Sequence, residues 1–194
     1  SRRYFLNQVV AAEDAFIAAP EWDTIAADHK AVQPDDEIVM FFDGSVNDDS
    51  TALVGCRVSD GHLFMIGGWD RPAGAAGNDW AVDKGDVDRI VRGALEHRNV
   101  VAFWGDVLHF EGHHDAWSTE FGHKLLLWAR EGKFRHATAW DMRLQTKPFT
   151  EACERFAADV REGVITHDGD PALRLHMLNA RRRPNRWGVG IGKE

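Results

Sequence analysis

Two aspartates that follow apolar runs are the residues of this chain best suited to chemistry. Asp43 comes directly after the run 38–42, and Asp106 comes shortly after the run 100–104. If these runs are neighbouring strands, both carboxylates emerge at one edge of a sheet. Mg²⁺ takes oxygen ligands and needs only one or two carboxylates, and two such ions roughly 3.5–4 Å apart can drive phosphodiester cleavage. Either aspartate alone is explained more simply as the start of a turn. The pair, in this strand arrangement, predicts a site for Mg²⁺ or Mn²⁺.

Two further acidic stretches could supply additional ligands. The loop 47–49 follows Asp43, and its Asp49 could reach back toward the metal site; a solvated turn explains this loop equally well. Asp168 or Asp170 could provide a third acid. However, Asp170 stands directly before Pro171, a pattern typical of the residue that caps the start of a helix. We therefore favour capping for this second stretch.

Other catalytic patterns are absent from the sequence. Histidines 109, 113 and 114 have no neighbouring cysteine and no HExxH pattern, so no zinc site is predicted. The glycine-rich stretch 188–193 lacks the first glycine and the final Ser or Thr of a phosphate loop. There is no Gly-x-Ser-x-Gly elbow, and neither cysteine has an evident histidine base. Zinc enzymes, ATPases and enzymes with a serine or cysteine nucleophile are thus disfavoured.

The charge of the chain is unevenly distributed. The net charge is −8, which argues against a protein that coats nucleic acid along its whole surface. Residues 181–194, however, contain five basic residues and one acidic residue, which leaves −12 on residues 1–180. Basic residues with tryptophans nearby suit contact with a DNA backbone. The candidates for DNA binding are Arg181, Arg182, Arg183, Lys133 and Arg135.

The composition indicates an ordinary globular protein. Of the 194 residues, 44% are apolar and 28% charged, which excludes wholesale disorder. No run approaches the roughly 20 apolar residues that span a bilayer, and the start shows no signal-peptide pattern. Cys56 and Cys153 lie in apolar surroundings, so we expect buried thiols in a reducing compartment.

The order of the expected elements predicts an α/β fold. We expect strands at 38–42, 51–58, 63–69, 100–104 and 125–128, an extended piece at 164–166, and helices at 9–18, 83–98, 111–121, 147–162 and 171–183. The first three strands form an antiparallel meander, and α/β units follow. This describes a ribonuclease H-like mixed sheet with helices on both faces. We divide the chain into a connecting segment (1–36), the main domain (37–183) and a glycine-rich basic tail (184–194).

Stretches in the same order along the chain resemble the nuclease domain of the large terminase subunit of tailed bacteriophages. They are FFDGS at 41–45, DDSTALV at 48–54, DGHLF at 60–64, WDRP at 69–72, VVAF at 100–103 with Asp106, and 163–180 with its HDGDP, His176 and Asn179–Ala180. The resemblance implies a metal-dependent endonuclease that cleaves concatemeric double-stranded viral DNA during packaging, with Asp43 and Asp106 as the first two metal-binding acids.

The resemblance also implies partners and a location. The expected partners are double-stranded DNA, a packaging ATPase domain preceding Ser1 in the same polypeptide, the portal and the small terminase subunit, with no membrane. The expected location is the cytoplasm of a bacterial host.

In one respect the chain departs from the family pattern. A third acid, in an Ile-Asp pattern followed by small residues, does not occur within 1–194. We expect it to lie beyond residue 194; the alternative is that Asp168 or Asp170 takes its place. A docking module of the packaging motor with an incomplete site, or another ribonuclease H-like nuclease such as a junction resolvase, are the alternative interpretations.

Overall fold

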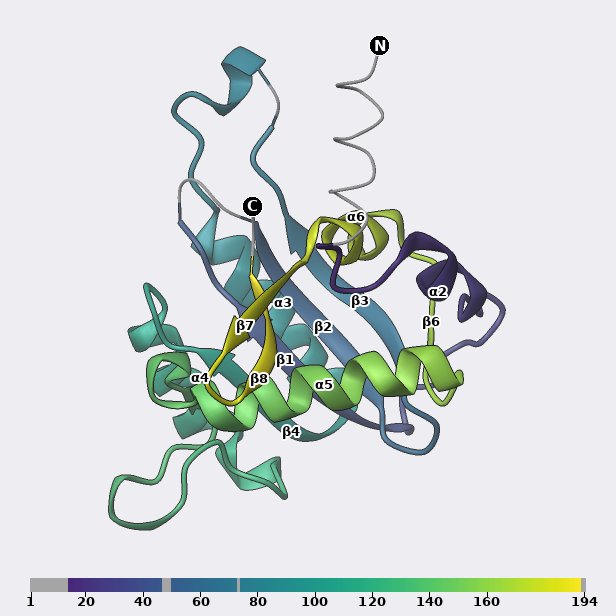
Figure 1. Cartoon of the computed structure of the whole chain (residues 1–194). Coiled ribbons are helices and arrows are strands. Elements are labelled where there is room, and N and C mark those ends of the chain that lie inside the picture. Colours follow the sequence, from purple (N-terminus) through teal and green to yellow (C-terminus); the bar gives the residue numbers. More distant parts are fainter. Residues whose placement is uncertain (1–13, 47–49, 73, 193–194) are drawn as a thin grey trace. The chain divides into compact units, whose positions relative to one another are not determined.

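The computed structural model describes residues 14–46, 50–72 and 74–192, and the chain divides into two compact units (Figure 1). One unit is Ala31–Met142, and the other combines Ser1–Lys30 with Arg143–Glu194. Within the described ranges, no helix has the length and apolar character needed to cross a membrane.

The unit Ala31–Met142 is built on a mixed sheet with the strand order β5-β4-β1-β2-β3. Its antiparallel pairs are β1 with β2 and β2 with β3, whereas β4 pairs in parallel with both β1 and β5. The predicted meander is therefore confirmed. The strands are β1 (Glu37–Asp43), β2 (Thr51–Arg57), β3 (His62–Trp69), β4 (Asn99–Asp106) and β5 (Ala139–Trp140).

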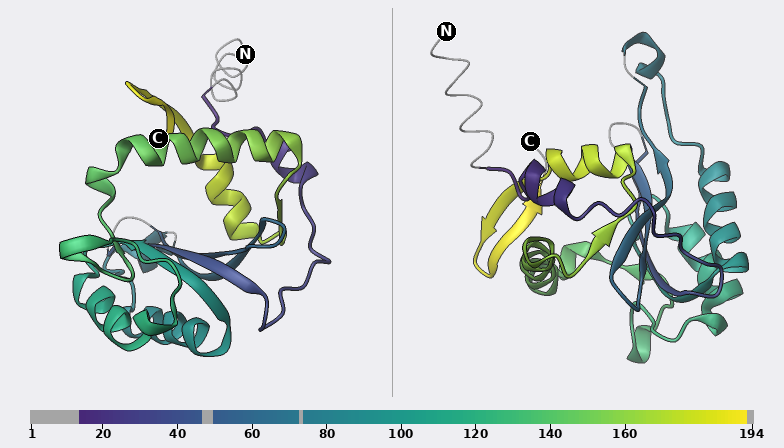
Figure 2. Two further views of the ribbon diagram at one scale, coloured as in Figure 1. Left: turned by 90° about the horizontal axis from the view of Figure 1, so that it is seen from below. Right: turned by 90° about the vertical axis from the view of Figure 1, so that its right-hand side faces the viewer.

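Two helices cover one face of this sheet, α3 (Lys84–His97) and α4 (Glu111–Phe121) (Figure 2). Both helices were predicted within one residue at each end. Helix α3 begins after Asp83, whose carboxylate accepts hydrogen bonds from the backbone N–H groups of Gly85 and Asp86 and so caps the helix. The core between helices and sheet is made of buried apolar side chains, among them Ile38, Met40, Phe42, Val87, Val91, Phe103 and Trp117.

The prediction of a strand at 125–128 was wrong. These residues form only an isolated bridge, between Leu127 and Ala102, and the fifth strand of the unit is the two-residue β5. Leu126 and Leu127 are exposed despite their apolar character. The N–H groups of Leu126 and Leu127 both donate to the Val101 carbonyl of β4, but the pairing does not continue along the segment, so the run makes a bridge and not a strand.

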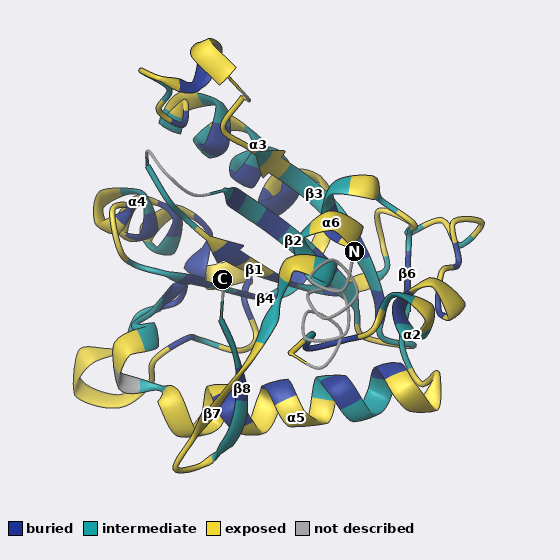
Figure 3. Ribbon diagram, turned by 45° about the horizontal axis from the view of Figure 1, so that its top comes forward, coloured by how far each residue is buried: buried dark blue, intermediate teal, exposed yellow. Residues whose placement is uncertain are grey.

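The other unit contains helices α2 (Ala19–Thr24), α5 (Thr146–Glu162) and α6 (Pro171–Asn179), strand β6 (Thr166–His167) and the antiparallel hairpin of β7 (Arg181–Asn185) and β8 (Gly188–Gly192). Buried residues recur along one side of α5, as Figure 3 shows, and Gly163 ends this helix in the left-handed conformation that glycine favours. His167 stacks on Trp22 with ring centroids 4.2 Å apart and donates from Nε2 to its carbonyl oxygen at 3.0 Å.

The last helix is shorter than predicted, and the tail is not a frayed end. Helix α6 stops at Asn179 instead of Arg183, and the three arginines belong to β7. The reason is a tertiary one: the carbonyl oxygen of Ala180 accepts from the N–H of Phe16, and the N–H of Arg182 donates to Asp14. These contacts hold the chain extended where its local pattern permits a helix.

The prediction of a helix at 9–18 is wrong for the residues of this range that the structure describes. Residues 9–13 lie outside the described part, and Phe16 and Ile17 are buried in non-helical backbone. Pro20 stands in the first turn of α2, so it begins a helix instead of ending one. The missing N–H of proline is no loss in a first turn, which explains this position.

A buried histidine holds together the end of β4, helix α4 and the start of β5. His114 is fully buried between the aromatic rings of Phe42, Phe103 and Trp117. Its Nδ1 lies 3.0 Å from the Thr138 hydroxyl, and its Nε2 lies 3.2 Å from the Asp106 carbonyl oxygen. A carbonyl can only accept, so Nε2 carries the proton and Nδ1 accepts from Thr138. Burial lowers the pKa of His114 from 6.5 to about 4, which keeps the ring neutral.

This lowered pKa predicts acid destabilisation. Between pH 6.5 and 4 the unfolded chain binds a proton at His114 and the folded chain does not, so stability is lost as the pH falls through this window. For this group alone we expect a loss of about 2 kcal/mol of unfolding free energy between pH 7 and pH 5. Urea denaturation in EDTA at pH 7 and at pH 5 measures this difference in unfolding free energy.

The matched variant is His114→Gln, whose amide can still donate toward Asp106 but does not titrate. Its unfolding free energy should change less between pH 7 and pH 5 than that of the unaltered chain. Equal pH dependence in the two proteins would refute the assignment to His114.

Candidate active site

The parallel pairing of β1 with β4 brings Asp43 and Asp106 to the same edge of the sheet. Phe42 is in register with Gly105, so the next residue along each strand is one of the two aspartates. Both strands run in the same direction, and both carboxylates therefore stand at carboxyl-terminal strand ends. The condition on which the predicted pair depends, that the two strands are neighbours, is therefore met.

The two aspartates lie on the half-exposed face of the sheet. Along β1, Ile38, Met40 and Phe42 are buried, whereas Phe41 and Asp43 are exposed. Residues 38–42 are apolar on both faces of the strand, but α3 and α4 pack against only one of these faces. Asp106 is half-buried. Solvent therefore reaches both carboxylates.

Aromatic and apolar side chains lie on the same face of the sheet as Asp43 and Asp106. The indole rings of Trp104 and Trp140 stack in parallel, with centroids 4.9 Å apart and an interplanar angle of 1°. A groove of about 280 Å³ runs along the same unit and is lined by Val39, Phe41, Cys56, Leu63, Trp104 and Leu127, among others.

Close packing beneath the edge determines where the strand ends lie. A β-carbon on Gly105 would stand 2.8 Å from Cε1 of His114 and 2.9 Å from the carbonyl oxygen of Phe42. A β-carbon on Gly44 would stand 2.5 Å from the ring of Phe110. Both positions require glycine because no other residue permits this approach. The backbone around both aspartates is therefore held by the core below it.

Asp141 is a residue that the sequence reasoning missed. Trp140 is in register with Asp106 across β4 and β5, so Asp141 stands one residue beyond that pair, directly after β5. Two neighbouring parallel strands thus end in an aspartate, and a third aspartate follows the next strand at the same end of the sheet. The available signal was an aspartate directly after the apolar pair Ala139–Trp140, but a strand of two residues has no periodicity to reveal it.

The loop after β1 is closed at its base by Thr51. Its buried hydroxyl accepts from the N–H of Ser45 and donates to the Ser45 carbonyl, both at 2.9 Å. Asp49, a predicted further ligand, lies outside the described residues. Within the ranges 14–46, 50–72 and 74–192, no three side chains of His, Cys, Asp or Glu converge closely enough to form a metal centre.

The second acidic stretch is confirmed as a helix cap. Oδ1 of Asp170 accepts from the N–H groups of Ala172 and Leu173, both at 2.9 Å, at the start of α6. Oδ1 of Asp168 accepts from the N–H of Asp170 at 2.9 Å. These contacts give Asp170 a structural role that needs no metal. A role of either aspartate as third acid stays a prediction.

The histidines near α4 are explained by local contacts. His114 is the buried ring described above, and His136 Nε2 lies 3.1 Å from the Asp115 carboxylate. His109 takes a positive φ of 69° in the turn before the helix. These contacts account for the rings of His114 and His136 as parts of the packing around α4.

The candidate DNA-binding residues fall into both units. Lys133 and Arg135 are exposed in the loop around Gly132–Phe134, and the Arg135 guanidinium lies 5.1 Å from the centre of the Trp128 ring. Arg182 and Arg183 are exposed on β7, and Arg181 is half-buried. At the turn of this hairpin, Arg186 and Lys147 both lie over the ring of Trp187.

Comparison with known proteins places the chain among phage proteins. No family model matches it. It is 43% identical over 198 residues to the Gene 13 proteins of Mycobacterium phages L5 and D29; the match covers 96% of this chain but only 32% of each relative. The chain therefore spans about a third of the length of these relatives.

Solved structures share its fold. The large terminase of bacteriophage HK97 superimposes with a TM-score of 0.63 at 14% identity, over 91% of this chain and 39% of that protein. The large terminase nuclease of the thermophilic phage G20c superimposes with a TM-score of 0.55 at 11% identity, over 93% of this chain and 89% of that one; its magnesium-bound form gives the same TM-score. The chain has the ribonuclease H-like fold of bacteriophage large terminase nuclease domains.

Proposed function

We propose that this chain is the metal-dependent endonuclease domain of a phage DNA-packaging terminase, and that it cleaves concatemeric double-stranded viral DNA. The observation that carries the proposal is the juxtaposition of Asp43 and Asp106 at the ends of two neighbouring parallel strands. The fold supports it, and so does the magnesium held by the G20c nuclease of the same fold. The relatives that match over nearly the whole chain are phage proteins.

The donor set of the edge fits a hard divalent cation. Asp43 and Asp106 offer carboxylate oxygens on a face that water reaches, and Mg²⁺ or Mn²⁺ completes its coordination with water and substrate phosphate. When bound, such an ion lowers the pKa of a water and neutralises charge on the phosphate. The part played by the protein is to hold both carboxylates at fixed positions, which the packing of Gly44 and Gly105 achieves. Asp49 is proposed as a further ligand.

In the intact protein we expect the domain to be joined to a packaging ATPase and to act with the portal and the small terminase subunit in the host cytoplasm. Arg181, Arg182, Arg183, Lys133 and Arg135 would contact the DNA backbone.

Replacing Asp43 or Asp106 by asparagine should abolish cleavage. Each substitution removes one anionic ligand while it preserves size, so we expect about a 100-fold or larger loss, equivalent to about 3 kcal/mol of transition-state stabilisation. Plasmid cleavage with Mn²⁺ measures it.

The matched control is Asp35→Asn, which makes the same charge change just before the opposite end of β1, where Asp35 is exposed. This variant should cut as the unaltered protein does. Full activity in Asp43→Asn would remove the site from consideration.

Removal of metal should stop cleavage reversibly. EDTA is expected to abolish cutting of plasmid, and excess Mg²⁺ or Mn²⁺ to restore it. Calorimetry should show heat of Mn²⁺ binding that is reduced in Asp106→Asn. Cleavage that continues unchanged in EDTA would contradict the mechanism, and preference for branched over linear DNA would favour a junction resolvase.

The third acid can be sought by comparing two variants. We expect Asp141→Asn to lower cleavage about tenfold, because its carboxylate follows β5 at the same end of the sheet and adds negative charge where Asp43 and Asp106 would hold a cation. Asp170→Ser preserves a capping side chain and should leave both cleavage and stability unchanged, whereas Asp170→Ala should cost about 1 kcal/mol of unfolding free energy. Loss of cleavage in a stably folded Asp170→Ser would instead identify Asp170 as the third ligand.

A further inference from the structure

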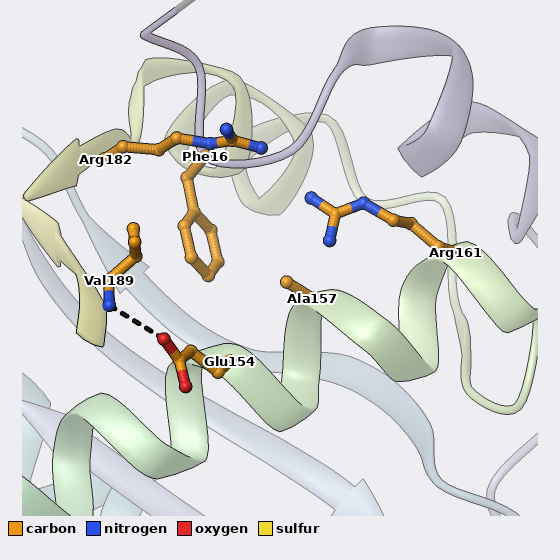
Figure 4. A pocket seen from close by; sticks show the side chains of 6 residues that line it. All are labelled: Phe16, Glu154, Ala157, Arg161, Arg182 and Val189. Atoms are coloured by element: carbon orange, nitrogen blue, oxygen red, sulfur yellow. Dashed lines mark hydrogen bonds between the residues drawn. The ribbon is translucent and has the colours of Figure 1, made fainter. Parts of the chain in front are cut away.

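A pocket far along the chain from the acidic edge brings two arginines together. It has a volume of about 240 Å³ and is lined by Phe16, Glu154, Ala157, Arg161, Arg182 and Val189 (Figure 4). All six residues belong to the same unit, and they come from the segment before α2, from α5 and from the hairpin. Phe16 and Ala157 are buried and form an apolar wall. The polar groups around this wall are one carboxylate and two guanidinium groups.

The carboxylate of Glu154 is used to attach the hairpin to α5. Its Oε1 accepts from the N–H of Val189 at 2.9 Å, which Figure 4 marks. A β-carbon on Gly188 would stand 2.2 Å from the same oxygen, so glycine is needed for this close approach. The backbone hydrogen bond stabilises the negative charge of Glu154 and directs one of its oxygens away from the pocket.

Arg161 is held in place through the Nε atom of its guanidinium group. Its Nε donates to Oε1 of Glu21 at 3.1 Å, while Oε2 of Glu21 accepts from the N–H of Ala18 at 2.9 Å. These bonds, with the nearby charges of Arg161 and Arg182, hold the pKa of Glu21 below its ordinary value. The two terminal nitrogens of Arg161 point into the pocket in Figure 4. They are donors in a fixed fork, the geometry that matches phosphate oxygens.

Arg182 completes the pair from β7. Its backbone N–H is bound to the carbonyl oxygen of Asp14 at 2.9 Å, which fixes the strand at this residue. Its guanidinium group extends above Phe16 on the same side of the pocket as Arg161. Two guanidinium groups therefore border the apolar wall, one of them held through Nε by Glu21 and the other brought there by its strand.

We propose that Arg161 and Arg182 together bind one backbone phosphate of DNA in this pocket. This proposal rests on the proposed function for the choice of ligand, and it adds a defined anchoring point distinct from the acidic edge. The apolar wall of Phe16 and Ala157, with Val189 beside it, suits the deoxyribose next to the phosphate. Alternation along β7 turns the neighbouring Arg183 to the opposite side of the strand, so Arg183 does not line this pocket although both arginines are exposed.

The test is binding of a fluorescently labelled 20-base-pair duplex, measured by anisotropy in EDTA so that no cleavage occurs. Arg161→Gln and Arg182→Gln should each weaken binding about 5- to 10-fold at 0.1 M salt and reduce the salt dependence by about one phosphate contact. The double variant should lose less than the product of the two single losses, because both arginines hold the same phosphate.

Two matched controls separate the pocket from simpler explanations. Arg155→Gln makes the same charge change at an exposed position of α5 that does not line the pocket, and it should alter affinity less than twofold; a loss equal to that of Arg161→Gln would overturn the pocket in favour of a diffuse effect of positive charge. Glu21→Gln keeps an oxygen that can accept from Nε of Arg161 but removes a negative charge beside the pocket, so DNA binding should stay equal or become stronger. Binding weakened as much as by Arg161→Gln would show that the effect is structural, and the proposal would fail.

Different results would overturn the phosphate pocket and the nuclease function. Unchanged DNA affinity in Arg161→Gln and Arg182→Gln, with Mn²⁺-dependent cleavage intact, overturns the phosphate pocket alone. Weakened affinity in these variants, with no cleavage by the unaltered chain, overturns the nuclease alone. Tight binding of inorganic phosphate that both variants abolish, without any change in DNA affinity, would assign the pocket to a free anion instead of DNA.

Discussion

The parallel pairing of β1 with β4 is the constraint on which the rest of the candidate site depends. A shift of one residue in this register would turn one of the two aspartates to the opposite face of the sheet, since side chains alternate along a strand. The register is maintained by the core: Ile38, Met40 and Phe42 of β1 and Phe103 of β4 are all buried against α3 and α4. The burial of apolar area on one face of the sheet therefore determines where two charged groups stand on the other.

His114 connects this core to the edge. A neutral imidazole buried among aromatic rings is costly unless both ring nitrogens are hydrogen-bonded, and here Thr138 and the carbonyl of Asp106 satisfy them. The same ring limits the space at Gly105. One side chain of α4 thus positions the backbone at the end of β4 and the segment that leads into β5. From the sequence, His114 was weighed only as a possible metal ligand. Two adjacent histidines do not indicate which of the two rings is buried.

The net charge of −8 is compatible with DNA as a partner because the charges are separated along the chain. Aspartates end β1 and β4 and follow β5 in the unit Ala31–Met142, where bound cations would neutralise part of their charge. Arginines occur on the hairpin of the other unit, and one of them enters a pocket with Arg161. An average over all residues conceals both features.

The sequence by itself determined the elements that are long and strongly patterned. The meander, β4, α3, α4 and α5 were predicted closely, since their patterns reflect burial on one face and their ends carry local signals such as Asp83 and Gly163. It also predicted the cap at Asp170, and it singled out Asp43 and Asp106, whose role as metal ligands stays a prediction.

Only the tertiary structure decided the remainder. β5, and with it Asp141, is defined by hydrogen bonds to β4 and has no pattern of its own. The arginines at 181–183 form a strand instead of a helical turn because Asp14 and Phe16 pair with the adjacent backbone. Contacts between residues more than a hundred positions apart leave no trace in local periodicity, and the pocket of Arg161 and Arg182 is a product of such contacts.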